Sequence, residues 1–146
     1  MGMYTEFHLN VELKKDTPKE VIDVLSYMAS TIYPKEVEPP TPKHVLFTED
    51  ESRWRYMMWC DSYYFPMNVQ SEFSFDDITN TYFLSVRCNL KNYTQEIQKF
   101  VDWLTPYIDE REGVFIGFMR YEEDDDPTLL YHPNKWVEVD SRGGAR

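Results

Sequence analysis

The segment YTEFHLNVELKKDTPKEVIDVLSYMAS, residues 4–30, places a period-two pattern directly before a helical one. In residues 4–13 apolar and polar side chains alternate, which predicts a strand with one buried face. Thr17, Pro18 and Glu20 then have the spacing of a capping box with proline at the first helical position. Apolar residues recur at helical spacing as far as residue 30, so an amphipathic helix is predicted. Its apolar face comprises Val21, Val24, Leu25, Met28 and Ala29.

The middle of the chain is predicted to be a connector followed by strands. Residues 33–43 contain four prolines, which exclude regular structure, and this connector is expected to lie over the sheet or across one of its edges. Residues 45–47 are expected to add a short edge strand. Antiparallel strands are predicted at residues 53–60, 72–75 and 81–90, and the last of these shows the clearest alternation.

The last third begins with a second helix, which starts at the potential cap Asn92 and ends near Pro106. A buried strand is predicted at residues 114–121. Residues 128–132 and 135–139 are expected to pair as a hairpin, and residues 141–146 to form a flexible tail. The predicted buried stripe of the second helix consists of Tyr93, Ile97, Phe100, Val101 and Leu104.

This order of elements predicts an α+β fold, an antiparallel sheet with two helices packed on one face. Residues 1–140 are expected to form a single domain, since the length is typical of one domain. A ferredoxin-like β-α-β-β-α-β core is contained in the order, with extra strands in the middle and at the end. That core is the alternative description, because one sequence does not specify the order of strands in a sheet.

The chain is strongly acidic: its 146 residues include 26 Asp and Glu against 15 Lys and Arg, a net charge of −11. This charge repels a phosphate backbone, so direct nucleic-acid binding is disfavoured, and a partner guided by charge is expected to be basic. No apolar run approaches the roughly 18 residues of a membrane span, and no secretion signal is evident. A cytoplasmic protein with reduced Cys60 and Cys88 is therefore expected.

No residues show a catalytic or metal-binding pattern. His8, His44 and His132 lack the paired motifs of two-histidine phosphoesterases and the setting of a serine nucleophile. We therefore expect a non-enzymatic protein without metal or cofactor. An acidic run lacks the alternating ligands and the glycine of a calcium loop, and it is a candidate contact surface instead. Its members are Glu122, Glu123, Asp124, Asp125 and Asp126.

A dense aromatic stretch supplies the other candidate binding residues. As a strand it would carry large apolar side chains on both faces, and only one face is needed for the core. The second face would then meet a second subunit, the proline connector or a ligand. The candidates are Arg53, Trp54, Arg55, Tyr56, Trp59, Tyr63 and Tyr64.

Residues 13–25, 53–65, 84–108 and 115–132 resemble a family of small uncharacterised acidic proteins, encoded by phages and integrated elements of Gram-positive bacteria. The resemblance implies an origin in a mobile element and a location in the cytoplasm of the bacterial host. It brings no catalytic residues with it. Small acidic phage proteins without enzymatic motifs often act by binding a host protein, including components of antiviral defence.

We therefore expect an accessory protein that binds a host or phage protein through its acidic surface and exposed aromatic rings. Inhibition of antiviral defence, including mimicry of nucleic-acid charge, is one form of this hypothesis, and a homodimer is a further expected contact. The alternative hypothesis is a protein that sequesters a nucleotide in an aromatic pocket. That pocket would be lined by Trp54, Tyr56 or Trp59, with Arg53, Arg55 or Arg87 facing it.

Overall fold

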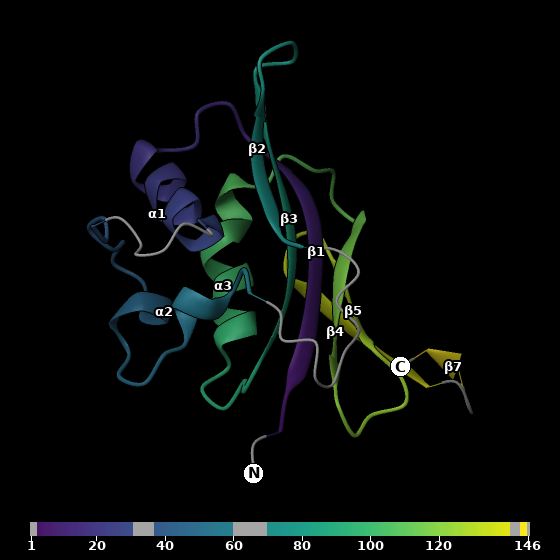
Figure 1. The fold of residues 1–146 in the computed structure, drawn as a ribbon. Coiled ribbons are helices and arrows are strands. Elements are labelled where there is room, and N and C mark those ends of the chain that lie inside the picture. Colours follow the sequence, from purple (N-terminus) through teal and green to yellow (C-terminus); the bar gives the residue numbers. More distant parts are fainter. Residues whose placement is uncertain (1–2, 31–36, 60–69, 141–143, 146) are drawn as a thin grey trace.

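The structure, a computed structural model, describes residues 3–30, 37–59, 70–140 and 144–145 (Figure 1). The order of helices and strands is the predicted one before residue 30 and between residues 70 and 140, and it differs from the prediction between residues 37 and 59. The elements in chain order are β1 (Thr5–Leu13), α1 (Lys19–Ala29), α2 (Val45–Thr48), η1 (Trp54–Tyr56), β2 (Glu72–Asp76), β3 (Thr81–Leu90), α3 (Glu96–Leu104), η2 (Thr105–Tyr107), β4 (Phe115–Tyr121), β5 (Thr128–Tyr131), β6 (Lys135–Asp140) and β7 (Gly144–Ala145).

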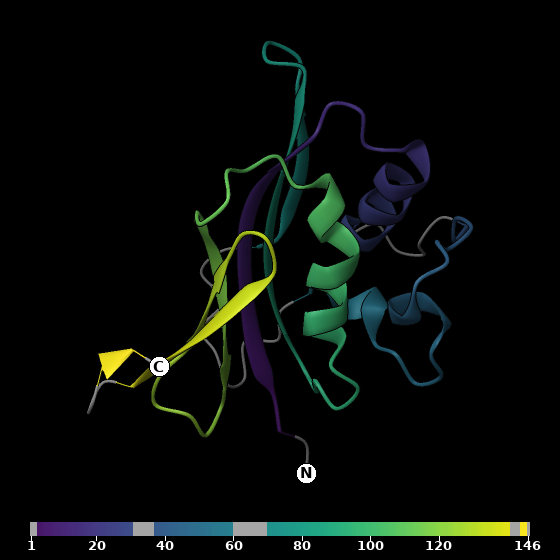
Figure 2. The ribbon, with the colours of Figure 1, turned by 180° about the vertical axis from the view of Figure 1, so that it is seen from behind.

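Within the described residues, seven strands form an antiparallel sheet of order β2-β3-β1-β4-β5-β6-β7. The first four strands, connected through α1 and α3, have the order and connections of the ferredoxin-like core. Both α1 and α3 lie on the same face of the sheet (Figure 1, Figure 2). The predicted α+β class is confirmed, and the predicted hairpin of β5 and β6 extends the sheet beyond β4.

The hydrophobic core lies between this sheet face and the two helices. Phe7, Leu9, Val11 and Leu13 of β1 are all buried, which confirms the predicted alternation. Phe7 meets Phe100 of α3 edge to face, with ring centroids 6.2 Å apart. The partners of β1 on β3 and the inner faces of the helices complete the core with Leu84, Val86, Cys88, Val21, Val24, Leu25, Met28, Ile97, Val101 and Leu104.

The predicted capping box at the start of α1 is wrong. The helix begins at Lys19, and Pro18 is the capping residue, with ψ 147°, rather than the first helical residue. The hydroxyl of Thr17 donates a hydrogen bond to the carbonyl oxygen of Lys14 at 2.6 Å. Because this hydroxyl closes the preceding turn, it makes no cap for the helix. The carbonyl of Pro18 instead accepts from the amides of Val21 and Ile22.

Residues 45–47 form a helical turn, α2, and the predicted edge strand is wrong. Ring atom Nδ1 of His44 accepts a hydrogen bond from the amide of Leu46 at 3.0 Å and so caps this turn. A histidine that caps the amide two residues ahead stabilises helical rather than extended backbone there.

The predicted strand at residues 53–60 is also wrong as far as the structure describes it, because Trp54–Tyr56 form the 3-10 helix η1. The buried side chains are Trp54, Met57 and Met58. Their i, i+3, i+4 spacing is typical of a helix. The sequence does not show this spacing clearly, because neighbouring residues are also large and apolar or aromatic. Helical segments therefore take the place of the extra middle strands between residues 37 and 59.

The second helix starts later than predicted, at Glu96. Asn92 still acts as a cap, since its side-chain oxygen accepts from the amide of Ile97 at 2.9 Å across a turn that has Gln95 at φ 58°. The longer turn removes Tyr93 from the helix, so its ring is exposed and its predicted burial is wrong.

Two peripheral segments complete the fold. The described part of the proline connector, residues 37–43, has Val37 and Pro39 beside α1, not over the sheet. β7 pairs with Val139 and Asp140 of β6, and the mobility of residues 141–146 stays a prediction. None of the helices in the described residues has both the length and the apolar character needed to cross a membrane.

Candidate functional site

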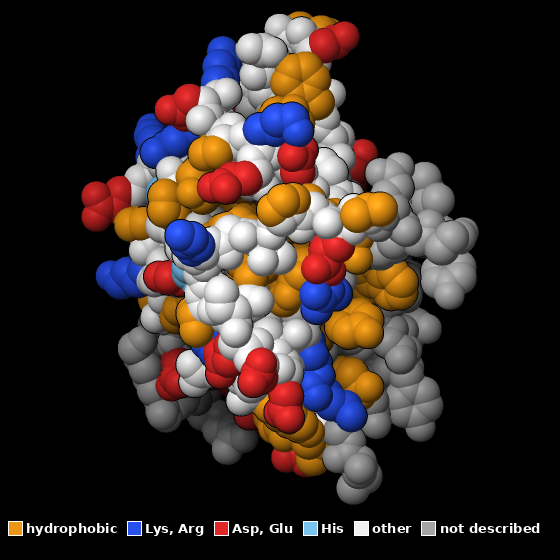
Figure 3. All heavy atoms as spheres, turned by 90° about the vertical axis from the view of Figure 1, so that its left-hand side faces the viewer, with side chains coloured by type: hydrophobic (Ala, Val, Ile, Leu, Met, Phe, Trp, Pro, Cys, Tyr) orange, Lys and Arg blue, Asp and Glu red, His pale blue; other side chains and the backbone are white. Residues whose placement is uncertain are grey.

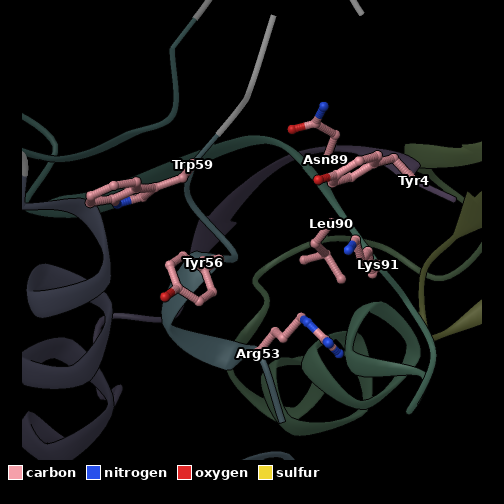
Figure 4. A pocket seen from close by; sticks show the side chains of 7 residues that line it. All are labelled: Tyr4, Arg53, Tyr56, Trp59, Asn89, Leu90 and Lys91. Carbon is pink, nitrogen blue, oxygen red and sulfur yellow. The ribbon is translucent and has the colours of Figure 1, made fainter. Parts of the chain in front are cut away.

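A cleft of about 500 Å³ opens between the η1 segment and the C-terminal end of β3. This volume lies within the range of about 300–1,000 Å³ that is usual for small-molecule sites. Three segments that are far apart in the sequence contribute to it (Figure 4). The described lining residues are Tyr4, Arg53, Tyr56, Trp59, Asn89, Leu90 and Lys91.

Backbone pairing brings these three segments together. Thr5 pairs with Leu90 in the ladder between β1 and β3, which places residue 4 next to Lys91. The amide of Asn89 donates to the carbonyl oxygen of Trp59 at 3.4 Å, and this bond attaches the η1 segment to the end of β3. The cleft is therefore built on the neighbouring strands β1 and β3, the two inner strands of the ferredoxin-like core.

One side of the cleft is aromatic. Tyr56 and Trp59 belong to one turn, since the amide of Trp59 donates to the carbonyl oxygen of Tyr56 at 3.0 Å. Their ring centroids are 6.2 Å apart and their planes are nearly perpendicular, at 81°. The residues are 54% and 47% exposed, so large ring surfaces are available to a ligand.

The other side of the cleft carries two positive charges, Arg53 and Lys91 (Figure 4). The ammonium of Lys91 lies 5.8 Å from the ring centroid of Tyr4, and the guanidinium of Arg53 lies 5.7 Å from that of Tyr93. The described lining residues include no Asp or Glu. In a protein with a net charge of −11, the described lining of the cleft is therefore positive, although the buried carboxylate of Glu96 behind Arg53 offsets part of that charge.

Glu96 holds the cationic side in place from behind. This residue is fully buried, and its carboxylate accepts hydrogen bonds from the amides of Arg53 at 3.0 Å and Thr94 at 3.1 Å. The guanidinium of Arg53 lies 3.7 Å from the same carboxylate. One side chain thus links the η1 segment to the loop between β3 and α3, and it fixes where Arg53 enters the cleft.

The fold places some of the predicted aromatic binding residues in the cleft and others in the core. Tyr56 and Trp59 line the cleft, but Trp54 is only 2% exposed and packs in the core against Phe47, with ring centroids 5.0 Å apart. The helical turn that presents Tyr56 outward turns Trp54 inward, so Trp54 has no surface to offer a partner. Tyr63 and Tyr64 lie outside the described residues.

Of the predicted arginines, one lines the cleft and the other two do not. Arg53 lines the cleft, whereas Arg55 donates to both carboxylate oxygens of Glu38, at 2.6 and 3.0 Å, and lies over the ring of Trp54. This hydrogen bonding raises the pKa of Arg55 and lowers that of Glu38. Arg87 is buried on β3 and is not one of the described lining residues.

The acidic run follows β4 in the turn to β5. Glu122 accepts a hydrogen bond from the amide of Tyr4 at 2.9 Å, while Glu123, Asp124 and Asp125 are exposed. Within the part of the chain that the structure describes, no group of three metal-ligating side chains occurs. On the side of the molecule formed by the helices, acidic and basic side chains are interspersed among apolar ones (Figure 3).

Two of the three histidines make clear structural contacts. His44 uses Nδ1 to cap α2, and its Nε2 bonds the carboxylate of Asp102 at 2.9 Å. His8 bonds Glu6 at 3.1 Å and stacks on Phe118 on the sheet face opposite the helices. These contacts account for both side chains without a role in chemistry.

Sequence reasoning missed Tyr4, Asn89, Leu90 and Lys91 as parts of a site. Asn89 and Leu90 are ordinary strand residues, and Lys91 is a lone lysine beyond the strand end. No local signal marks them, because their proximity to Arg53 and Trp59 depends entirely on the pairing of distant segments.

Comparison of the chain with protein-family models, with curated proteins and with solved structures gives no significant match.

Proposed function

We propose that this protein binds a small molecule that combines a flat ring with an anionic group, and that it does so in the cleft between η1 and the end of β3. The observation that carries this proposal is the composition of the cleft: aromatic rings on one side and two cations on the other, with no carboxylate among the described lining residues. In an acidic protein, such a local reversal of charge favours a specific anion.

A different interaction binds each half of the ligand. A flat ring that covers Tyr56 or Trp59 removes exposed aromatic surface from water and gains stacking contacts. An anion beside Arg53 and Lys91 receives charge-assisted hydrogen bonds in a partly desolvated site. Because the described lining residues include no His, Cys, Ser, Thr, Asp or Glu, binding rather than turnover is proposed.

The test is calorimetric titration of the protein with nucleoside monophosphates, aromatic carboxylates and their uncharged ring analogues. We expect one or more of the charged ring compounds to bind, and the uncharged analogues to bind at least tenfold more weakly. Lys91→Met should weaken binding of the charged compounds about tenfold or more. Its matched control is Lys15→Met, an exposed lysine beyond the opposite end of β1, which should change nothing.

The aromatic side has its own pair of variants. Trp59→Leu should weaken binding of every ring compound, whereas Phe115→Leu removes a similarly exposed ring from β4 and should leave binding intact. Failure of all charged ring compounds to bind at millimolar concentration would refute the proposal.

A second candidate function is binding of a host protein, as expected for an accessory protein of phage origin. The observation that favours it is the large exposed aromatic area formed by Tyr56, Trp59 and the neighbouring Tyr93, which is 60% exposed. Capture of one specific protein from host lysate, lost in Trp59→Leu and retained in Phe115→Leu, would support this function. Mimicry of nucleic-acid charge further requires that the captured complex weakens as salt rises.

A further inference from the structure

From the arrangement of charges and rings in the cleft, we infer that its ligand is a mononucleotide, with the base at Tyr56 and Trp59 and the phosphate at Arg53 and Lys91. This identification rests on the proposed function of the cleft, and it goes further by naming the chemical class of the ligand. Three observations carry it: the hydrogen-bond donors of the two cations, the separation of these cations from Tyr56 and Trp59, and the acidity of the rest of the protein.

The donors of the two cations match a phosphate better than a carboxylate. A phosphate monoester has three acceptor oxygens, whereas a carboxylate has two. The buried carboxylate of Glu96, 3.7 Å from the guanidinium of Arg53, offsets part of its charge. That guanidinium donates no hydrogen bond to another described residue, and Lys91 has no ion pair there, so both retain their donors for a ligand. A planar guanidinium also binds phosphate through two parallel hydrogen bonds.

Tyr56 and Trp59 lie on one side of the cleft and the two cations on the other, where the ring of Tyr4 lies near Lys91 (Figure 4). A ligand that uses both sides needs a spacer between its ring and its anion, and a ribose supplies one. The cleft of about 500 Å³ has the size of a site for one such compound.

The acidity of the protein favours a single nucleotide over a polymer. Single-stranded nucleic acid is bound by an extended positive groove that follows its backbone. Here Arg53 and Lys91 lie within one cleft, and the net charge of −11 repels the phosphates that would continue beyond it. A mononucleotide places its only phosphate where the local charge is positive.

The experiment is calorimetric titration of the full chain with AMP, GMP, CMP and UMP, with the matching nucleosides, with inorganic phosphate, with indole-3-acetate and with a ten-nucleotide single strand. We expect at least one mononucleotide to bind tenfold or more tightly than its nucleoside, phosphate, indole-3-acetate and the strand. Lys91→Met should remove most of the advantage over the nucleoside. Trp59→Leu should weaken the mononucleotide and its nucleoside to a similar extent.

Each other outcome overturns the inference in a distinguishable way. If indole-3-acetate binds as well as or better than every mononucleotide, the proposed function stands and the assignment of a mononucleotide falls. Tighter binding of the strand would overturn the assignment of a single nucleotide. If neither the mononucleotides nor the aromatic carboxylates bind to a protein whose thermal melting shows that it is folded, both the inference and the proposed function fall.

Discussion

Replacement of Glu96 by glutamine tests how the cationic side of the cleft is held. The fully buried carboxylate accepts hydrogen bonds from the amides of Arg53 and Thr94. A glutamine side chain has nearly the same shape but only one acceptor oxygen. In either orientation of the amide, one of the two backbone N–H groups loses its acceptor.

The expected loss in the free energy of unfolding follows from that lost hydrogen bond. A hydrogen bond to a charged acceptor contributes about 1.5–3 kcal/mol to stability, and an orphaned buried donor costs a similar amount. We therefore expect Glu96→Gln to lower the free energy of unfolding by about 1.5–3 kcal/mol.

Urea denaturation followed by circular dichroism measures this change, with Glu112→Gln as the matched control. Glu112 is exposed in the turn before β4, so its replacement should change stability by less than about 0.5 kcal/mol. If the two variants have the same free energy of unfolding, the carboxylate of Glu96 does not hold the loop and η1 segment as described.

Two further predictions concern other parts of the fold. In Gly117→Ala, the added Cβ would overlap the backbone carbonyl of His8 in the neighbouring strand, so we expect a loss of about 3 kcal/mol or more, or failure to fold, measured by the same denaturation. Gly113→Ala is its control, because φ +89° strains an alanine by about 1 kcal/mol but no atom lies within 4 Å of the new Cβ. Hydrogen bonding to Arg55 lowers the pKa of Glu38 in the folded protein. The resulting stability, below about 1 kcal/mol for so exposed a pair, is present above the unfolded pKa of about 4.3 and disappears as pH falls through the lower folded value. Glu38→Gln should therefore reduce stability at pH 7 but not at pH 2, and an equal loss at both pH values would contradict the role of this charge.

Charge is distributed unevenly between the cleft and the rest of the protein. The excess of carboxylates disfavours contact with polyanions. Lys91 follows β3 and has no ion pair with another described residue, whereas Arg53 is fixed through its amide and its guanidinium lies 3.7 Å from the buried carboxylate of Glu96. Arg55, two residues away, donates to both carboxylate oxygens of Glu38 and is not one of the described lining residues of the cleft.

Local patterns in the sequence determined the parts of the fold in which one element buries one face. The alternation in residues 4–13 and 82–86 and the helical spacing in residues 21–28 and 97–104 predicted burial correctly, because a strand repeats every two residues and a helix every 3.6. In residues 87–90 both faces are buried, so Arg87 and Asn89 are not exposed as the alternation predicts. The same reasoning failed for residues 53–59. Large apolar side chains there face the core and the solvent alike, so the pattern indicated no single period.

Only the tertiary structure decided where binding residues meet. Tyr56, Trp59 and Arg53 were visible in the sequence as an aromatic and basic stretch, but Trp54 and Arg55 in the same stretch point elsewhere. Lys91 and Tyr4 carried no signal at all. Their positions follow from the hydrogen bonds between β1 and β3 and between residues 59 and 89, which join groups tens of residues apart. Pairing over such distances minimises the free energy of the whole chain, and no local window of sequence contains it.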